Sequence, residues 1–299
     1  MSFDKLLAAL ASEGGKDMRI LITGSSGYLG SAIAQLLAIN HEPVGIDVAP
    51  GPWTQHVVDI TDRSLMGKLV KGIDAIIHIA SLHQPHLVTH SSQQFLAINV
   101  TGTLNMLEAA VQNSVRRFVY TSTTSLYGHA LVPQHKAVWV TEDLPPRPRD
   151  IYDHTKVTAE RLCRHFALHK GLPTICLRVA RFFPEPAEIQ VVHRLYRSVD
   201  VRDAAVAHLL AAINTTVLFD IMNISASSPF LESDTPMLLR DAAAVIRARV
   251  PTLEPFFACH GWKLPTSIDR VYVSERARRQ IRYNPLHNFS EYLQEIECI

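Results

Sequence analysis

The sequence predicts an α/β fold: a Rossmann-type, doubly wound parallel sheet with a small C-terminal capping lobe. Short apolar runs alternate with amphipathic runs from Arg19 onward, an order typical of parallel strands joined by crossover helices. The first apolar run, RILITG, leads through a glycine-rich turn into a run whose apolar residues recur at helical spacing. Right-handed crossovers between such elements build a doubly wound sheet.

The individual elements follow from this alternation. We expect buried strands over residues 19–24, 42–47, 71–81, 116–122 and 173–180. We expect helices over residues 25–40, 61–70, 91–113 and 152–170. Beyond Phe182 the alternation weakens, and proline-rich connectors interrupt it at 184–186, 229–236 and 251–265.

These patterns divide the chain into three parts. Residues 1–17 are predicted to be an N-terminal tail, and residues 18–181 the Rossmann core. Residues 182–299 are predicted to form a small substrate-capping lobe, interleaved with the remaining core elements. We expect this lobe over the carboxyl ends of the strands, where open α/β sheets bind ligands.

Composition excludes several classes of protein. With 299 residues, 47% of them hydrophobic and 19% charged, the chain has enough apolar surface for a substantial core. A net charge of +1 gives no indication of a nucleic-acid partner. The longest apolar runs, such as residues 75–80, are too short to cross a membrane. The four cysteines are scattered, without a C-x-x-C pair, which favours a reduced, cytoplasmic location.

The glycine-rich turn predicts a dinucleotide site. Gly24, Gly27 and Gly30 form T-G-x-x-G-x-x-G, in which glycine lets the backbone approach a pyrophosphate at the helix N-terminus. Asp47 closes the second strand 23 residues after Gly24 (47 minus 24). A carboxylate there accepts hydrogen bonds from the adenosine ribose and repels a 2′-phosphate, so the cofactor is expected to be NAD. Asp59 either meets the adenine edge or caps the helix that follows.

Tyr152 and Lys156 stand four residues apart in a helical run, and this spacing places both side chains on one helix face. A nearby ammonium favours the ionised phenol, which suits an acid/base catalyst. The alternative is that Tyr152 and Lys156 lie on the exposed face of an amphipathic helix and have no catalytic role. The hydroxyl-rich sequence TSTTS at the end of the fourth strand offers the partner that a catalytic pair requires.

Eight features in a fixed order carry a family resemblance: TGSSGYLG, Asp47, HVVDITD, IIHIAS, INVTGTLNMLEAA, FVYTSTTSLYG, YDHTK and LRVARFF. Together they resemble the extended short-chain dehydrogenase/reductases of the NAD-dependent epimerase/dehydratase group, from about Met18 to the final helix. The resemblance implies NAD as cofactor and reversible hydride transfer at a hydroxyl-bearing carbon of a sugar-like small molecule. It also implies a homodimer that pairs helices 91–113 and 152–170.

The same resemblance implies roles for individual residues. Tyr152 is the acid/base, Lys156 binds the nicotinamide ribose and lowers the pKa of the tyrosine, and Thr123 polarises the substrate oxygen. Asn99 braces the backbone near the catalytic strand, and Val179 lies against the carboxamide. The expected cofactor contacts are Gly24, Ser26, Gly27, Tyr28, Leu29, Gly30, Asp47, Asp59, Ile60, Ile79, Ala80, Ser81, Asn99, Tyr152, Lys156 and Val179.

The sequence departs from the family pattern around Arg181. Members that act on nucleotide sugars usually have asparagine there and a longer segment afterwards, whereas Arg181 and Asp200 are only 19 apart (200 minus 181). This spacing favours a smaller substrate, and the P-E-P after the strand is similar to uronate dehydrogenases. Arg181 either binds a substrate carboxylate or phosphate, or pairs with Glu185 or Asp200.

Further substrate contacts are expected at the end of the fourth strand and near the C-terminus. Lys263 and Arg270 are both possible counterparts of the basic residue with which the family contacts phosphate. Thr124 and Ser125 stand where the dehydratases of the family have an Asp-Glu pair, so dehydration is disfavoured.

His83, His86 and His90 fall in one segment after the expected strand 71–81. Pro85 interrupts the helix that would align them, and no cysteine or paired carboxylate completes a set, so we expect no metal. His83 is instead a candidate for substrate contact.

The sequence leaves the reaction open. Return of hydride to the other face of the ketone gives an epimerase, and release of NADH gives a dehydrogenase, with oxidation of a free sugar acid as one possibility. A protein of another class, a catalytically silent NAD sensor or scaffold, has the same fold. Because Thr123, Tyr152 and Lys156 are all present, the enzyme is favoured.

Overall fold

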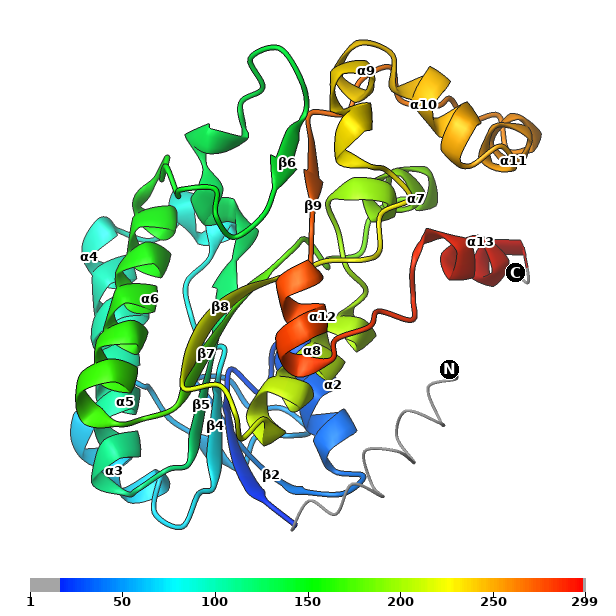
Figure 1. Ribbon diagram of the computed structural model, residues 1–299. Coiled ribbons are helices and arrows are strands. Elements are labelled where there is room, and N and C mark those ends of the chain that lie inside the picture. Colours follow the sequence, from blue (N-terminus) through cyan, green and yellow to red (C-terminus); the bar gives the residue numbers. More distant parts are fainter. Residues whose placement is uncertain (1–16, 298–299) are drawn as a thin grey trace.

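A computed structural model describes residues 17–297, so all of the expected N-terminal tail except Asp17 lies outside the described residues, as does Cys298. Its centre is a seven-stranded parallel sheet in the order β3-β2-β1-β4-β5-β7-β8 (Figure 1). The strands are β1 Arg19–Thr23, β2 Glu42–Asp47, β3 His56–Val57, β4 Ala75–His78, β5 Arg117–Thr123, β7 Thr174–Val179 and β8 Phe219–Ile224. The predicted doubly wound fold is confirmed.

Helices cover both faces of the sheet (Figure 1). One layer contains α2 (Tyr28–Leu37) and α8 (Val201–Ile213); the other contains α3 (Arg63–Leu69), α5 (Thr103–Gln112) and α6 (Ile151–Lys170). Successive residues of β1 show why the strand is apolar throughout. Ile20 and Ile22 pack in the core beneath α2 and α8, whereas Leu21 packs in the core beneath α3, α5 and α6.

Several elements differ from those expected. The edge strand β8 was not predicted, because FDIMNI interrupts its apolar residues with Asp220 and Asn223; it pairs with β7 from Thr174↔Phe219 to Val179↔Ile224. The expected helix 91–113 is a helical run of α4 (Ser92–Phe95), a π-helical segment (Leu96–Gly102) and α5. Short β3 was also not predicted.

The capping lobe has its own small core above the carboxyl ends of the strands. It contains a two-stranded parallel ribbon, β6 (Val138–Val140) with β9 (Arg270–Tyr272), so one of its strands comes from the first half of the chain. Its helices are α7 (Ala187–Tyr196), α9 (Thr235–Arg240), α10 (Ala242–Arg249), α11 (Leu253–Cys259) and α13 (Phe289–Glu297), while α12 (Glu275–Ile281) packs on β8 and α8. Short 3-10 turns are η1 Gln84–Val88, η3 Thr124–Tyr127, η4 His129–Leu131 and η5 Glu232–Asp234.

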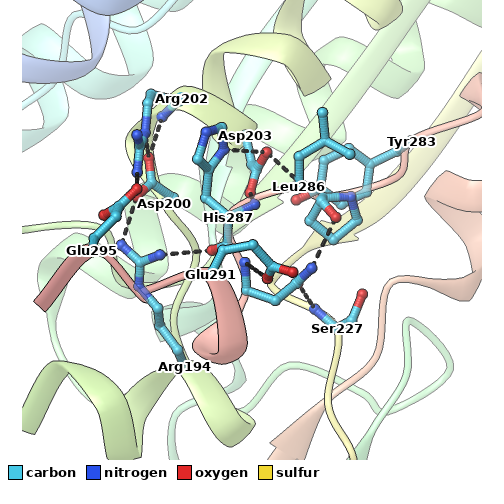
Figure 2. A network of polar contacts seen from close by, with 12 residues as sticks. Arg194, Asp200, Arg202, Asp203, Ser227, Tyr283, Leu286, His287, Glu291 and Glu295 are labelled. Atoms are coloured by element: carbon cyan, nitrogen blue, oxygen red, sulfur yellow. Dashed lines mark hydrogen bonds and ion pairs between the residues drawn. The ribbon is translucent and has the colours of Figure 1, made fainter. Parts of the chain in front are cut away.

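A network of ion pairs fastens the C-terminal segment to the start of α8 (Figure 2). Arg194 of α7 donates to the Asp200 carboxylate at 2.6 Å and to the backbone oxygen of His287 at 2.6 Å. The Asp203 carboxylate accepts the backbone N–H groups of Leu286 and His287. Hydrogen bonds and charge from Arg202 and Arg194 outweigh burial and hold the pKa of the Asp200 carboxyl below its usual range.

Within residues 17–297, no helix combines the length and the hydropathy that a membrane crossing requires.

Candidate active site

A cavity of about 1020 Å³ lies at the carboxyl ends of the central strands. Its lining includes the glycine-rich turn after β1 and arginines from the core and from the lobe. The residues that the sequence nominated for the cofactor, for catalysis or for the substrate line this cavity, with the exception of Asn99 and Lys263. The cavity is large enough for a dinucleotide together with a small substrate.

The glycine-rich turn has no room for side chains at two of its positions. Gly24 has a φ of +78°, in the left-handed region, and a Cβ there would lie 3.0 Å from the Ala80 backbone nitrogen. A Cβ on Gly30 would lie 2.0 Å from the Gly24 carbonyl oxygen. Gly27 is the N-cap of α2, and among the described residues no side chain caps this helix end. The first-turn N–H groups of α2 therefore fit the pyrophosphate of a dinucleotide.

Two carboxylates mark the adenosine end of the cavity. Asp47, at the end of β2, accepts hydrogen bonds from the backbone N–H groups of Ser26 and Ala49, both at 3.0 Å. Asp59 also lines the cavity and accepts the N–H of Thr61 at 2.8 Å. The capping role considered for Asp59 is wrong, because Asp62 is the N-cap of α3 and accepts the N–H of Leu65.

Tyr152, Lys156 and Thr123 meet in the middle of the cavity. Tyr152 and Lys156 lie one turn apart on the buried face of α6, with 7% and 3% of their surfaces exposed, which excludes the alternative of a surface pair. The Tyr152 hydroxyl lies near the Thr123 hydroxyl at the end of β5, and this neighbour acts to lower the pKa of the phenol. Lys156 Nζ donates to the Thr121 carbonyl oxygen at 2.9 Å, and it lies 5.9 Å from the centre of the Tyr152 ring.

Burial dominates the electrostatics of this pair. It raises the pKa of Tyr152, and the Thr123 hydroxyl opposes this only in part. The direction is the reverse of that expected from the Tyr152–Lys156 spacing. Burial also lowers the pKa of Lys156 to about 8, while the Glu160 carboxylate acts to raise it. The ammonium therefore titrates close to neutral pH.

Four arginines line the cavity: Arg149, Arg181, Arg197 and Arg270. Arg181 pairs through Nε with Glu185 at 2.7 Å and not with Asp200, so the first of the two structural pairings considered is present. Arg270 pairs with Asp269.

Arg197 differs from these neighbours. It forms no ion pair with any residue of the described range 17–297, and its Nε atom is buried without a hydrogen-bond partner. Asp47 and Asp59 are the only carboxylates among the described cavity-lining residues, but Arg149, Arg181 and Arg270 pair with Asp153, Glu185 and Asp269, which do not line the cavity. Arg197 is therefore the one arginine of the four whose charge no ion pair within residues 17–297 balances, and it favours an anionic group.

Aromatic rings form one wall of the cavity. His83 stacks on Phe183 with ring centres 5.7 Å apart and an angle of 11° between the rings, and Phe182 stacks on Tyr28 at 6.4 Å. Burial, together with His86 and Lys156, lowers the pKa of His83 to about 4, so its ring is neutral at physiological pH. No group of histidine, cysteine and carboxylate side chains within residues 17–297 has the arrangement of a metal site.

Asn99 braces the site from behind the cavity instead of contacting the cofactor space. Its side-chain oxygen accepts the N–H of Leu82 at 2.7 Å, and its nitrogen donates to the Leu82 carbonyl and to Thr155. This arrangement ties the loop after β4 to the catalytic helix α6. The expected bracing role fits this placement, whereas the expected cofactor contact does not.

Sequence reasoning missed several residues of the site. Arg149 lies just before α6 and donates to the Ser125 hydroxyl at 3.1 Å, while Arg197 follows α7. Phe182 and Phe183 follow Arg181 directly in LRVARFF. Their position at the end of a strand was a usable signal for the two rings, but Arg197 reaches the cavity only through the packing of α7.

Comparison with known proteins agrees with the fold and the motifs. The profile described as "NAD dependent epimerase/dehydratase family" matches residues 20–199. A Bacillus subtilis protein described as an uncharacterized UDP-glucose epimerase, YtcB, is 27% identical over 60% of this chain and 62% of its own length. A uronate dehydrogenase of Pseudomonas putida is 25% identical over 58% of this chain and 65% of its own length. The chain thus matches less than two thirds of either relative.

Among solved structures, a short-chain dehydrogenase/reductase superfamily protein from Agrobacterium tumefaciens, crystallised with bound NAD, has the same fold. Its TM-score is 0.70 at 22% identity, over 93% of this chain and 95% of that chain.

Proposed function

The chain belongs to the NAD-dependent epimerase/dehydratase family, and on that premise we propose that it is an NAD-dependent enzyme acting on a sugar or sugar derivative. It transfers hydride reversibly at a hydroxyl-bearing carbon. One observation carries this proposal: Tyr152, Thr123 and Lys156 line the same cavity as the glycine-rich turn, with Lys156 Nζ 5.9 Å from the centre of the Tyr152 ring.

The chain's own residues handle the proton and the orientation of the substrate. Thr123 holds the substrate hydroxyl oxygen next to the Tyr152 phenol, and Tyr152 takes the hydroxyl proton as the carbon gives up hydride. Lys156 holds the cofactor ribose and, as an ammonium, favours the tyrosinate against the effect of burial. When bound, NAD supplies the hydride acceptor, with its pyrophosphate on the first turn of α2 and its adenosine ribose at Asp47.

The substrate carries a carboxylate or phosphate that faces the lobe. Arg197, which has no carboxylate partner among the described residues, supports this proposal most directly, whereas Glu185 and Asp269 already balance the charges of Arg181 and Arg270. His83 and Phe183 offer a neutral aromatic surface on which the apolar face of a sugar ring packs.

Oxidation of a free sugar acid is the reaction that this arrangement favours. Arg181 stands where the nucleotide-sugar enzymes usually have asparagine, and α7 and α8 follow it after a short connection. The uronate dehydrogenase relative is consistent with this candidate, and the UDP-glucose epimerase relative keeps epimerisation as the second candidate.

Absorbance at the NADH band tests the proposal and separates the two reactions. Purified protein is mixed with NAD and a panel of free uronates, neutral aldoses and nucleotide sugars. Net NADH with a uronate establishes a dehydrogenase, whereas no net NADH with an altered nucleotide sugar by NMR establishes an epimerase. If no sugar is oxidised or altered although NAD binds, the catalytic proposal is wrong and the silent-sensor alternative takes its place.

We also propose that the protein is a cytoplasmic homodimer. Helices α5 and α6 contact each other on one side of the sheet, and Leu96, the first residue of the π-helical segment that precedes α5, is 47% exposed. Light scattering should give twice the mass of the chain, and Leu96→Glu should shift the protein toward the monomer. A monomeric wild-type protein would contradict the dimer.

A further inference from the structure

The catalytic helix faces three successive residues of β5 through three side chains spaced four apart. Tyr152 lies near Thr123, whose hydroxyl influences the pKa of the phenol, and Lys156 donates to the Thr121 carbonyl at 2.9 Å. One turn further on, Glu160 Oε1 accepts the hydroxyl of Ser122 at 2.6 Å. The first two contacts belong to the proposed catalytic set. The third is buried behind it and has no role in the mechanism so far.

Glu160 is itself held by a second strand. Arg178 of β7 binds both of its carboxylate oxygens, Nε to Oε1 at 2.9 Å and Nη2 to Oε2 at 2.7 Å, in a pair whose side chains are 5% and 4% exposed. Arg178 also donates to the Tyr127 hydroxyl at 3.0 Å, and Tyr127 donates to Asn223 of β8 at 2.8 Å. The Glu160 carboxylate is therefore fixed in one geometry by partners on two strands.

The surroundings of Lys156 show why this carboxylate matters. The titratable and charged groups that face the ammonium are Tyr152, Glu160 and Cys163 of α6, His78 of β4, His83 after β4, Tyr120 of β5 and Cys176 of β7. Burial lowers the pKa of His78 to about 3 and raises the pKa of Cys176, so both are neutral near pH 7. Glu160 is the carboxylate of this set.

We propose that Glu160 is a positioning residue for the reaction: clamped by Arg178 and Ser122, its carboxylate keeps Lys156 protonated and holds the strand end that carries Thr123. This inference rests on the proposed function of the site. The negatively charged Glu160 carboxylate thus stands between two positive charges, those of Lys156 and Arg178. Removing the middle charge leaves two cations in a buried site, and the ammonium, which is the easier of the two to deprotonate, loses its proton first.

Direct titration of Lys156 tests the electrostatic part without any substrate. Protein labelled with ¹³Cε-lysine gives one signal per lysine, and the Lys156→Met variant identifies the signal of Lys156. In the wild type we expect a midpoint near pH 8. In Glu160→Gln we expect the Lys156 midpoint to be about one pH unit lower, because loss of a neighbouring opposite charge shifts a pKa by about that much. Ser122→Ala is the control, because it removes a partner of Glu160 and keeps the charge, and its midpoint should not move.

Turnover and NADH binding complete the test. If the proposed function holds, Glu160→Gln should reduce kcat at least tenfold at pH 8 with a smaller change in KM, while Glu160→Asp, which restores the charge, should recover part of the rate. An unchanged Lys156 midpoint in folded Glu160→Gln would overturn the inference, as would a shifted midpoint with full turnover. Failure of the wild type to bind NADH would instead overturn the proposed function. The two failures can be told apart, because the titration of Lys156 needs neither NADH nor substrate.

Glu160→Gln leaves Arg178 buried without its carboxylate, so that variant can fail to fold. The double variant Glu160→Met with Arg178→Met then takes its place, because apolar side chains of similar volume often replace a buried ion pair without loss of stability. It lacks the carboxylate but also the more distant Arg178 cation, so a downward shift of the Lys156 midpoint smaller than that of Glu160→Gln is expected. An unshifted midpoint would again count against the inference.

Discussion

Replacing Gly30 by alanine should damage cofactor binding through sterics alone. The added Cβ would lie 2.0 Å from the Gly24 carbonyl oxygen and 2.8 Å from its carbonyl carbon, both of them backbone atoms. Ordinary contact begins at 3.4 Å, so these atoms have to separate by about 1.4 Å (3.4 minus 2.0), and overpacking of this kind costs about 1–3 kcal/mol. The turn also carries the amide groups assigned to the pyrophosphate, and a shift of about 1 Å in a binding site can cost on the order of a hundredfold.

The assay combines NADH fluorescence titration with thermal melting. We expect a Kd for NADH that is tenfold to a hundredfold weaker in Gly30→Ala, together with a melting temperature lowered by a few degrees. Gly67→Ala is the matched control: this glycine also lies inside a helix, but its Cβ would meet only the end of the Gln112 side chain, at 3.9 Å. There the better helix propensity of alanine should raise stability by about 0.5–1 kcal/mol. Wild-type NADH affinity in Gly30→Ala would refute the assignment of the turn to the cofactor.

Four further changes have distinct expected results. Tyr152→Phe should abolish turnover and leave NAD binding nearly intact; a fully active variant would remove Tyr152 from the mechanism. Asp47→Ala should weaken the binding of NAD much more than the binding of NADP; an unchanged preference for NAD over NADP in cofactor titrations would show that Asp47 does not contact the ribose. Arg197→Gln should raise KM for an anionic sugar about tenfold or more without affecting a neutral aldose, whereas equal effects on both would argue against an anion contact. Asp200→Asn should lower the melting temperature at pH 7 by several degrees. Because the folded-state pKa of Asp200 is depressed, its contribution to stability is present above about pH 4 and is lost as pH falls, so the two melting temperatures should converge in acid; a constant gap would contradict this linkage.

The core of the fold followed from local patterns. The strands predicted at 19–24, 42–47, 116–122 and 173–180 match β1, β2, β5 and β7 within a residue or two, because strands buried on both faces are continuous apolar runs. The expected strand 71–81 contracts to β4, since a turn occupies its first residues and its end bends over the cavity. Strand β8 was not predicted, because an edge strand tolerates polar residues such as Asp220, which interrupt the apolar run that indicates a buried strand.

The candidate site, like the fold, was predicted from the sequence only in part. Gly24 is required by its own positive φ and Gly30 by the Gly24 carbonyl six residues away, and Tyr152 and Lys156 share a face by helical geometry alone, so a single stretch of sequence is enough to predict them. Pairing of Arg181 with Glu185 instead of Asp200 was undecided, because Arg194 and Arg202 compete for Asp200 from other parts of the chain.

What the sequence determined by itself is therefore the order of strands and helices, the glycine-rich turn and the catalytic spacing, all of which depend on neighbours within a few residues. Only the tertiary structure decided that burial raises the pKa of Tyr152 and that Arg197 lines the cavity. It also decided that Glu160 stands between Lys156 and Arg178. The physical reason is that burial and charge depend on every group within a few ångströms, and those groups come from strands and helices far apart in the chain.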